Sequence, residues 1–559
     1  MDKLVIGTRG SRLSLAQTKI VTDRLAELFP GLTLDIKTIN THGDLHQDAR
    51  LVKADQVGVF VKEIDRALAS GEIDAAVHSL KDVPTSQPDI IRISAIVERA
   101  DPRDVLISRS GKKLAELPPY ARIGTSSVRR KSQLLACRSD LDIVEMRGNV
   151  DGRIAKLDNS DYDAIVLAAA GVERLGLQNR ITEYLPLSLM LPAPGQGALA
   201  IETRSNDKAA HEIISKLDDV GVKAAVEAER TVLSHIGGGC DVPLGILAKV
   251  EGAALKIDAC ITGSDGAVRY TYTQKGSVKL PEEAGLTLAE KMLMSKAMGI
   301  IVESSVRSAL CGKLVMVTRE EQPNDGLCSM LLERAAIPIY FPTMKTKLLL
   351  QKTAEDTIPD PHTYDAIVVT SKRSVPYLAA SLGASKAGAK VIAVGDETKR
   401  FLEEYGIAVT YVPEDSSAKS IPAGIGKVKG ANILVINSAR AENSLAEELT
   451  AMGAIVERIN PYTIVQPQVS LARRNAVAGY KLDFITFASP SAVEGLLGIM
   501  GECTSRLLSK CKVVCIGETT AKACIENGIL VSGIARQHSI QGMVSCMEKI
   551  VEDGYRDGK

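Results

Sequence analysis

The segment Leu4-Val5-Ile6-Gly7-Thr8-Arg9-Gly10-Ser11 changes from apolar to polar within a few residues. Residues 4–8 have the composition of a short buried strand, and Arg9-Gly10-Ser11 predicts a tight turn after it. Ser11 is a residue type that caps helices, because its hydroxyl accepts from a free backbone N–H group. From Leu13 to Leu28 apolar residues recur at helical spacing. The segment therefore predicts a strand, a turn and a helix, the repeating unit of an α/β fold.

The same order recurs further along the chain. Residues 121–125 repeat the opening pattern, with Ser126 or Ser127 as the expected helix cap. Other buried strands are predicted over residues 73–78, 142–146 and 163–169. Residues 40–60 show no clear period and are interpreted as a long, mobile loop. The residues up to about 197 are thus predicted to form α/β domains.

Charged residues gather where these strands end. Lys81 and Asp82 follow the strand at 73–78, at the end where open α/β sheets bind ligands; a surface ion pair is the alternative. Arg129 and Arg130 oppose the dipole of a helix N-terminus, a conflict that a bound anion would remove. Each arginine alone is consistent with a solvated side chain. Together they predict a cleft for a polyanion, because arginine binds carboxylates in a bidentate way; the set is Arg9, Arg129, Arg130, Arg147, Arg153 and Arg174.

A second unusual stretch is Gly237-Gly238-Gly239-Cys240, followed by Pro243. Glycine permits backbone angles that other residues avoid, so the thiol of Cys240 is predicted to lie on an accessible loop. A tight turn with an incidental thiol is the alternative. The loop belongs to a smaller α+β unit predicted over residues 220–308, which follows a crossing segment at Pro192–Gly197.

The C-terminal part contains an internal repeat. Residues 364–375 parallel residues 482–493, and residues 391–398 parallel residues 513–520. Each copy is predicted to run strand, Ser/Thr cap, helix, strand, glycine turn, helix. We interpret the copies as two similar lobes across a cleft lined by hydroxyls and helix N-termini, which favour anions; duplication of a stable scaffold is the alternative.

Composition limits the classes of function. The 559 residues predict about three to five domains. Lys+Arg and Asp+Glu both number 68, and tryptophan is absent, so neither nucleic acid nor a membrane surface is an expected partner. The N-terminus shows no signal-peptide pattern, and no apolar run reaches the length of a bilayer span. The scattered cysteines predict no metal site and indicate reduced thiols in a cytoplasm.

Residues 1–310 resemble hydroxymethylbilane synthase, also called porphobilinogen deaminase. The motifs that carry the resemblance occur in order along this segment: residues 8–11, 78–84, 124–130, 147–150, 192–197 and 238–243. One departure is Ala54-Asp55-Gln56-Val57-Gly58, where the family has a Gly-Lys-Gly stretch. Residues 312–559 are similar to uroporphyrinogen-III synthase, through the duplicated architecture and the turns at 370–371, 488–491 and 516–521.

The first resemblance implies an enzyme that joins four porphobilinogen molecules to a dipyrromethane cofactor, with loss of ammonia, and releases hydroxymethylbilane. Cys240 would hold the cofactor through a thioether, and Asp82 would stabilise the azafulvene cation formed by ammonia loss. The other implied cofactor-binding residues are Lys81, which is also assigned a catalytic role, Asp82 itself, Thr125, Ser127, Arg129, Arg130 and Gly171. The implied substrate-binding residues are Arg9, Ser11, Arg147, Arg153 and Arg174.

The second resemblance implies closure of hydroxymethylbilane to uroporphyrinogen III with inversion of the last ring. Tyr462 matches a family tyrosine in approximate position and is assigned a catalytic role. The substrate-binding candidates in this half are Ser371, Thr398, Ser489, Thr519 and Thr520.

The two resemblances together imply two receptor-like α/β domains, a small α+β domain and a two-lobed α/β synthase. The expected boundaries are 1–97 with 198–218, 98–197, 219–310, 312–345 with 464–559, and 346–463. We expect a cytoplasmic monomer that acts on porphobilinogen and hydroxymethylbilane and needs no metal. The alternatives are a hydroxymethylbilane synthase with a non-catalytic C-terminal module and a two-lobed protein that binds small anions.

Overall fold

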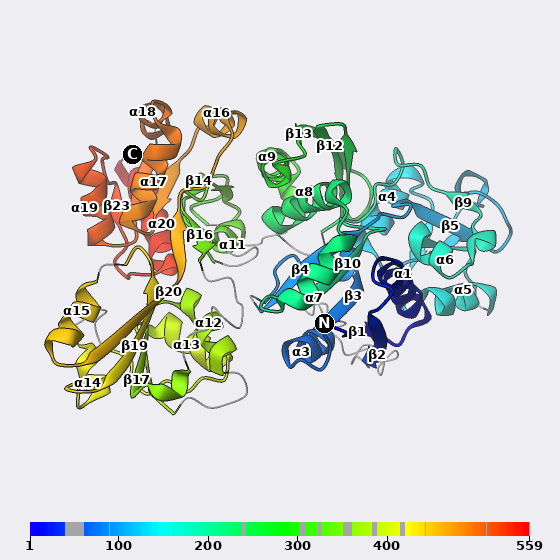
Figure 1. Cartoon of the computed structure of the whole chain (residues 1–559). Helices are drawn as coiled ribbons and strands as arrows, with labels where there is room; N and C mark the ends of the chain where they lie inside the picture. The colour runs from blue at the N-terminus through cyan, green and yellow to red at the C-terminus, as the bar shows by residue number, and fades with distance from the viewer. Residues whose placement is uncertain are drawn as a thin grey trace. The chain divides into compact units, whose positions relative to one another are not determined.

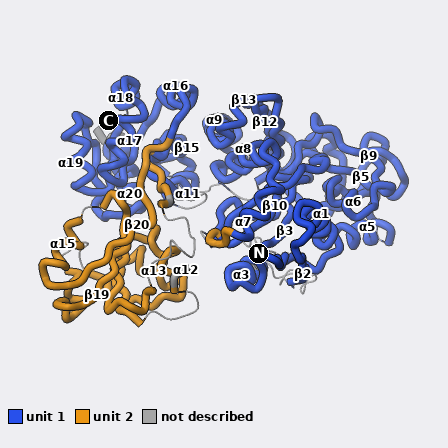
Figure 2. The backbone as a smooth tube through the Cα atoms, viewed as in Figure 1, with its two compact units in different colours: residues 1–204, 209–342, 468–559 blue, residues 205–208, 343–467 orange. Residues whose placement is uncertain are grey.

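The structure is a computed structural model that describes most of the chain. The described residues are 1–39, 61–88, 90–159, 161–237, 242–301, 308–321, 326–349, 360–382, 388–413, 420–441, 443–509 and 511–557. The predicted loop at 40–60 and Cys240 lie outside them. The chain forms two compact units, one of residues 1–204, 209–342 and 468–559, the other of residues 205–208 and 343–467 (Figure 2).

The first sheet of the larger unit is built around the opening segment. Its strands have the order β2-β1-β3-β10-β4, and β10 runs antiparallel to both of its neighbours. The strands are β1 (Lys3–Arg9), β2 (Thr33–Ile39), β3 (Ala75–Ser79), β4 (Ile91–Val97) and β10 (Leu199–Arg204). The helices of this region are α1 (Arg12–Leu28), α3 (Lys62–Ala69) and α7 (Lys208–Ile214). The predicted strand, turn and helix at the N-terminus are confirmed.

The second sheet has the order β7-β6-β8-β5-β9. Its strands are β5 (Asp104–Ser108), β6 (Arg122–Gly124), β7 (Asp142–Val144), β8 (Ala164–Ala168) and β9 (Glu183–Tyr184). Helices α4 (Val128–Cys137), α5 (Val150–Asn159) and α6 (Ala169–Arg174) follow β6, β7 and β8 (Figure 1). Because β6 pairs in parallel with β7 and β8, all three helices start at the same edge of the sheet.

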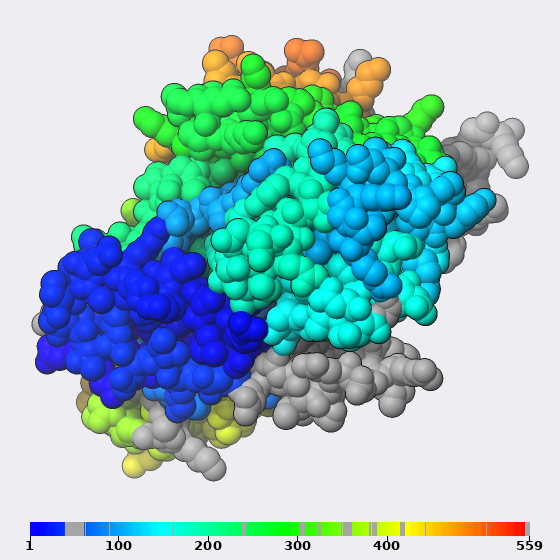
Figure 3. Space-filling view, turned by 90° about the vertical axis from the view of Figure 1, so that its right-hand side faces the viewer, coloured from blue at the N-terminus to red at the C-terminus, as the bar shows by residue number. Residues whose placement is uncertain are grey.

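The next region, here called the α8–α9 module, is the predicted α+β unit. It contains an antiparallel sheet and two long helices. The strands of the sheet are β11 (Leu244–Glu251), β12 (Ala254–Thr262) and β13 (Arg269–Ser277). The two helices are α8 (Val220–Ile236) and α9 (Pro281–Leu293), and α10 (Met298–Ile301) follows them. Figure 3 shows the blue residues of the first sheet region and the cyan residues of the second side by side, with the green residues of the module next to them.

A parallel sheet, here called the β14 sheet, completes the larger unit. Its order is β15-β14-β21-β22-β23, from β14 (Leu314–Val317), β15 (Ile337–Tyr340), β21 (Phe484–Phe487), β22 (Lys512–Cys515) and β23 (Gly533–Ile534). Its helices are α11 (Gly326–Leu332), α16 (Leu471–Gly479), α17 (Pro490–Met500), α18 (Cys503–Leu508), α19 (Glu518–Glu526) and α20 (Ile540–Asp557).

The smaller unit contains the fifth sheet, in the order β16-β20-β19-β17-β18. Its strands are β16 (Lys345–Leu348), β17 (Ala366–Val369), β18 (Lys390–Ala393), β19 (Asn432–Ser438) and β20 (Ile455–Val465). Its helices are α12 (Val375–Leu382), α13 (Asp396–Glu404), α14 (Ile421–Ile425) and α15 (Ser444–Ala451).

The internal repeat is present in both units. β17 pairs in parallel with β18 and is followed by α12, just as β21 pairs in parallel with β22 and is followed by α17. Ser371 and Ser489 are the caps at equivalent places, and Gly395 and Gly517 precede α13 and α19. The predicted α/β class and the predicted order of elements in each copy are therefore confirmed.

No helix in the described ranges is both long enough and apolar enough to cross a lipid bilayer.

Candidate functional site

A buried leucine follows the end of strand β3. Leu80 is fully buried and its N–H donates to the carbonyl of Ala198, which fixes a single 3-10 turn, η1 (Leu80–Asp82). The next buried residue is Val83. Between these two anchors, the side chain of Lys81 is half-buried and that of Asp82 is exposed. The two residues predicted to lie at a ligand-binding strand end are therefore held by a rigid turn.

Charged side chains of the second sheet region interact electrostatically with this turn. The carboxylate of Asp82 acts on the pKa of Arg130, at the start of α4, and on that of Arg153, in α5. Burial, with the neighbouring charge of Arg130, lowers the pKa of Arg153 to about 10, although Asp82 opposes the change. The structure thus brings Asp82 together with two of the predicted arginines, across two sheets.

Burial disfavours the charged form of several cations in this cluster. Burial lowers the pKa of Lys81, and Arg130 and Arg129 lower it further, although Asp82 and Asp104 raise it. Burial also lowers the pKa of Arg174. A cationic group whose pKa is lowered by burial and by like charges is stabilised when an anion comes close. The arrangement can therefore bind an anionic ligand, and carboxylates suit it.

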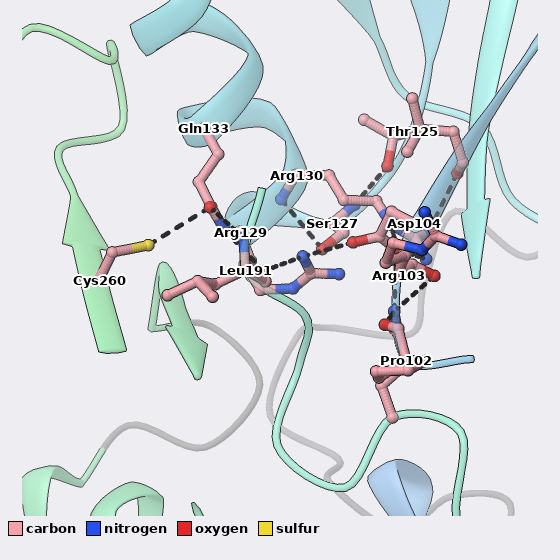
Figure 4. Close-up of polar contacts among 12 residues, drawn as sticks. Pro102, Arg103, Asp104, Thr125, Ser127, Arg129, Arg130, Gln133, Leu191 and Cys260 are labelled. Atoms are coloured by element: carbon pink, nitrogen blue, oxygen red, sulfur yellow. Dashed lines mark hydrogen bonds and ion pairs between the residues drawn. The ribbon is translucent and has the colours of Figure 1, made fainter. Parts of the chain in front are cut away.

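Arg129 and Arg130 themselves are buried and bind a carboxylate of the chain, Asp104 at the start of β5 (Figure 4). Arg129 Nη1 donates to Asp104 Oδ2 over 2.7 Å, and Arg130 Nε donates to Oδ1 over 2.9 Å. Gln196 Nε2 donates to the same Oδ1 over 3.1 Å. The anion that offsets these two charges at the helix N-terminus is thus Asp104, and Arg130 contributes to the site of Asp82 mainly through its charge.

The crossing segment predicted at 192–197, with the preceding Leu191, is held by further hydrogen bonds. Arg129 Nη1 and Gln133 Nε2 both donate to the carbonyl of Leu191, over 2.8 and 3.1 Å. Gly195 N donates to Glu229 of α8, which also forms an ion pair with Arg99. The segment between the first two sheets is therefore bonded to both α4 and α8.

We expect Asp104→Asn to lower the free energy of unfolding by about 3 kcal/mol, because it leaves two buried guanidinium groups without their counter-charge. The Arg129 and Arg130 charges outweigh burial and hold the pKa of Asp104 well below its usual range. Its contribution to stability is therefore complete above the pKa of an unfolded aspartate, about 3.9, and is lost as pH falls toward the folded pKa.

Chemical denaturation at pH 7 measures this effect, with Asp158→Asn as the control, since Asp158 pairs with Arg180 at the surface. Equal stability of the two variants would contradict the assigned role of Asp104.

Several predicted residues serve the local backbone. Ser11 Oγ accepts from Ser14 N over 3.1 Å, and Ser127 Oγ accepts from Arg130 N over 3.4 Å, so the cap predicted at 126 or 127 is Ser127. Thr125 is buried, and its Oγ1 accepts from Ser127 N. A Cβ at Gly171 would lie 3.6 Å from Leu13 Cδ2, an ordinary contact.

The remaining predicted arginines have other described contacts. Arg147 is exposed and its Nε donates to Glu145 Oε1 over 2.6 Å. Arg153 Nε donates to Gly148 O and Arg174 Nη2 donates to Gly197 O, both over 2.7 Å. Arg9 is the last residue of β1 and is half-buried. The charge of Asp82 raises the pKa values of Arg130 and Arg153, although burial lowers both.

The hydroxyls predicted in the C-terminal half divide into two sets. Ser489 Oγ accepts from Ala492 N at the start of α17, Thr520 is buried and Thr519 is exposed. In the smaller unit, Ser371 Oγ accepts from Arg373 N, and Thr398 is buried in α13. Tyr462, the predicted catalytic residue of this half, is buried in β20 and pairs with Leu348 of β16.

Sequence reasoning missed Asp104, Gln133, Gln196 and Glu229. The adjacent Arg129 and Arg130 did indicate a missing anion, but nothing in the local pattern marks its position in β5. The signal available was a polar residue at the start of an apolar run, Asp104-Val105-Leu106-Ile107.

Family models match most of the chain. Residues 4–212 match "Porphobilinogen deaminase, dipyromethane cofactor binding domain", and residues 223–294 match "Porphobilinogen deaminase, C-terminal domain". Residues 327–545 match "Uroporphyrinogen-III synthase HemD".

The relatives and solved structures that are similar to this chain each cover about half of it. The porphobilinogen deaminase of Syntrophomonas wolfei is 45% identical over 304 residues, which are 54% of this chain and 99% of that protein. The enzyme of Thermus thermophilus is 48% identical over 294 residues, 52% of this chain and 96% of that protein. A mutant uroporphyrinogen III synthase from Thermus thermophilus is 16% identical with a TM-score of 0.33, covering 44% of this chain and 100% of that structure. The Helicobacter pylori enzyme is 17% identical with a TM-score of 0.31, covering 42% and 97%.

Proposed function

We propose that the turn at Lys81 and Asp82 supplies catalytic residues for the first reaction of this chain, which belongs to the porphobilinogen deaminase family. The chain is a bifunctional enzyme of tetrapyrrole biosynthesis, because a uroporphyrinogen-III synthase domain follows the deaminase. The first activity joins porphobilinogen units with release of ammonia, and the second closes the linear product into a ring. The observation that supports the first assignment is that Asp82, whose side chain is exposed on this turn, interacts electrostatically with Arg130 and Arg153.

The residues present fit a dipyrromethane, whose side chains are carboxylates. Lys81 and Arg153 are half-buried cations whose pKa values are lowered by burial and by Arg130, so anionic groups stabilise them. We assign the covalent attachment to Cys240, which follows the end of α8. When bound, the group supplies a nucleophilic pyrrole carbon. Lys81 and Arg130 would hold its carboxylates, and Arg153 would bind the incoming substrate. Ser127 accepts from the N–H of Arg130, and Thr125 accepts from the N–H of Ser127.

Asp82 is proposed to stabilise positive charge on the substrate. Loss of ammonia from an aminomethylpyrrole leaves a cation that the ring nitrogen shares, and a carboxylate fixed nearby lowers the energy of that state. The turn η1 is fixed before the reaction by Leu80 and Val83, so little reorganisation is needed at the moment of charge formation. The exposed side chain of Asp82 is open to the substrate.

The second activity is proposed to need positioning more than strong acid. Loss of the terminal hydroxyl of hydroxymethylbilane makes another stabilised cation, and the last ring must then turn before closure. Helix starts bearing hydroxyl caps can bind the substrate carboxylates, since free N–H groups attract anions there. We assign this binding to Ser371, Thr398, Ser489, Thr519 and Thr520.

The isomer formed by the intact chain tests both activities. Supplied with porphobilinogen, the full chain should release ammonia and yield mainly type III uroporphyrinogen, separated chromatographically after oxidation. Hydroxymethylbilane left without enzyme closes to type I and is the reference. Mainly type I product would identify the C-terminal half as a non-catalytic module. Absence of ammonia release would favour a protein that only binds small anions.

Tyr462→Phe should shift the product only partly toward type I. The ring of Tyr462 stays buried in β20 and only its hydroxyl is removed, so the loss is that of about one hydrogen bond, roughly 1 kcal/mol. The measurement is the ratio of isomers at equal conversion, with Tyr364→Phe as the control, because the Tyr364 hydroxyl donates to Glu457. A ratio equal to that of the parent would remove Tyr462 from the site.

A further inference from the structure

A buried ion pair joins the α8–α9 module to the β14 sheet region of the larger unit. Arg473 of α16 donates to both carboxylate oxygens of Glu290 in α9, over 2.5 and 2.6 Å. Both side chains are only 3% exposed. Tyr480 Oη donates to Glu290 over 3.0 Å, and Arg473 Nη2 also donates to the carbonyl of Tyr340. A buried charge is tolerated when its partners are complete, and here both are bonded.

A second polar contact continues the junction at the start of α16. Ser470 caps this helix, and both its N–H and its hydroxyl donate to the carboxylate of Glu283 in α9. Glu283 therefore holds the helix start that carries Arg473. The cap binds Glu283 in the first turn of α9, and the ion pair binds Glu290, about two turns further along the same helix.

The same junction reaches the end of α8. The ring of His235 lies against the ring of Tyr340 in β15, with centroids 5.2 Å apart. Gly237 ends α8 with φ of 74°, and a Cβ there would lie 3.4 Å from Leu332 Cδ1 of α11. Burial lowers the pKa of His235 to about 4, with a further contribution from Arg473, although its contact with Thr231 raises it. The last turn of α8 is thus in contact with the β14 sheet region.

Apolar packing is continuous across the junction. One cluster of buried residues contains Val232 and Ile236 of α8, Leu288 and Met292 of α9, and side chains of the β14 sheet region. The members from that region include Ile339, Phe341, Val477 and Phe487. Two domains that share one apolar core are expected to open together.

We propose that the β14 sheet region is a structural support for the α8–α9 module, holding the end of α8 from which the segment with Cys240 begins. Loss of this support loosens the anchor of the cofactor, so the synthase part would be required for full loading of the deaminase part. The coupling itself stands on the contacts above, and its consequence for the cofactor rests on the proposed function.

Hydrogen exchange of the full chain, read by mass spectrometry, tests the coupling. Arg473→Met should speed exchange about tenfold at residues 230–237 and 281–293, because it leaves Glu290 buried without its counter-charge. Arg474→Met is the matched control, since this neighbour on α16 contacts the carbonyl of Ile499 instead. The double variant Glu290→Gln/Arg473→Met, which removes both charges, should exchange more slowly at these residues than Arg473→Met.

Acceleration confined to residues 468–509 would overturn the proposal, as would equal effects of Arg473→Met and Arg474→Met. The fraction of protein carrying a covalent adduct, measured by intact mass, should fall in Arg473→Met and stay at the parent level in Arg474→Met. An unchanged fraction overturns the link to cofactor loading. Absence of any adduct from the parent protein would instead refute the cofactor assignment and leave the exchange comparison valid.

Discussion

Cys240→Ser should give a folded protein without a covalently bound dipyrromethane and with almost no tetrapyrrole formation. Serine preserves the size of the side chain, so the effect is chemical: a hydroxyl is a much weaker nucleophile than a thiolate at neutral pH. The residue follows the glycine run that begins at Gly237, the residue that ends α8. The expected loss is essentially the whole activity.

Intact mass and the rate of porphobilinogen consumption measure this result together. Cys137→Ser is the matched control, since Cys137 is an exposed thiol at the end of α4 and should leave both quantities unchanged. Normal turnover by Cys240→Ser, or loss of the adduct from Cys137→Ser, would show that the anchor is placed on the wrong cysteine.

Asp82→Asn should lower turnover on the order of 10²- to 10³-fold while preserving the fold, by comparison with removing one preorganised electrostatic group elsewhere. The amide keeps the shape of the side chain, and the turn is held by Leu80 and Val83 instead. The substitution removes the negative charge that interacts with Arg130 and Arg153. The change therefore acts on the transition state and spares the core.

Single-turnover release of ammonia from protein that already carries the adduct measures the chemical step. Asp140→Asn is the control, since Asp140 pairs with Arg138 away from the turn. A loaded Asp82→Asn protein that turns over at the parent rate would remove the catalytic role of Asp82. Failure to load would move its role to cofactor assembly.

Local features of the fold were predictable because their causes lie within a few residues. Ser11 and Ser127 cap their helices through bonds to residues three positions ahead, and the strands at the start of each α/β segment are short apolar runs. The repeat in the C-terminal half was also visible, since equivalent strands and caps recur at equivalent spacing. The motifs at 78–84 and 124–130 indicated the site itself.

Pairing between distant charges was not predictable in this way. Arg129 and Arg130 are predicted to bind an anionic ligand, and the sequence did not indicate that both also bind Asp104, which precedes them by 25 and 26 residues. Because β5 runs antiparallel to β8, and β8 runs parallel to β6, the start of β5 lies at the sheet edge where α4 begins, and both arginines reach the carboxylate there. The number of cationic side chains available to a ligand at the site therefore depends on tertiary packing.

The sequence by itself determined the order of elements, the helix caps, the duplicated half and the family, because each is written in local periodicity or contiguous motifs. The tertiary structure alone decided which charges are neutralised inside the protein and which remain for a ligand. It also decided that Glu290 and Arg473, 183 residues apart, join two catalytic parts of one chain. The physical reason is that a buried charge takes the partner that folding brings near, and burial makes that choice costly to undo.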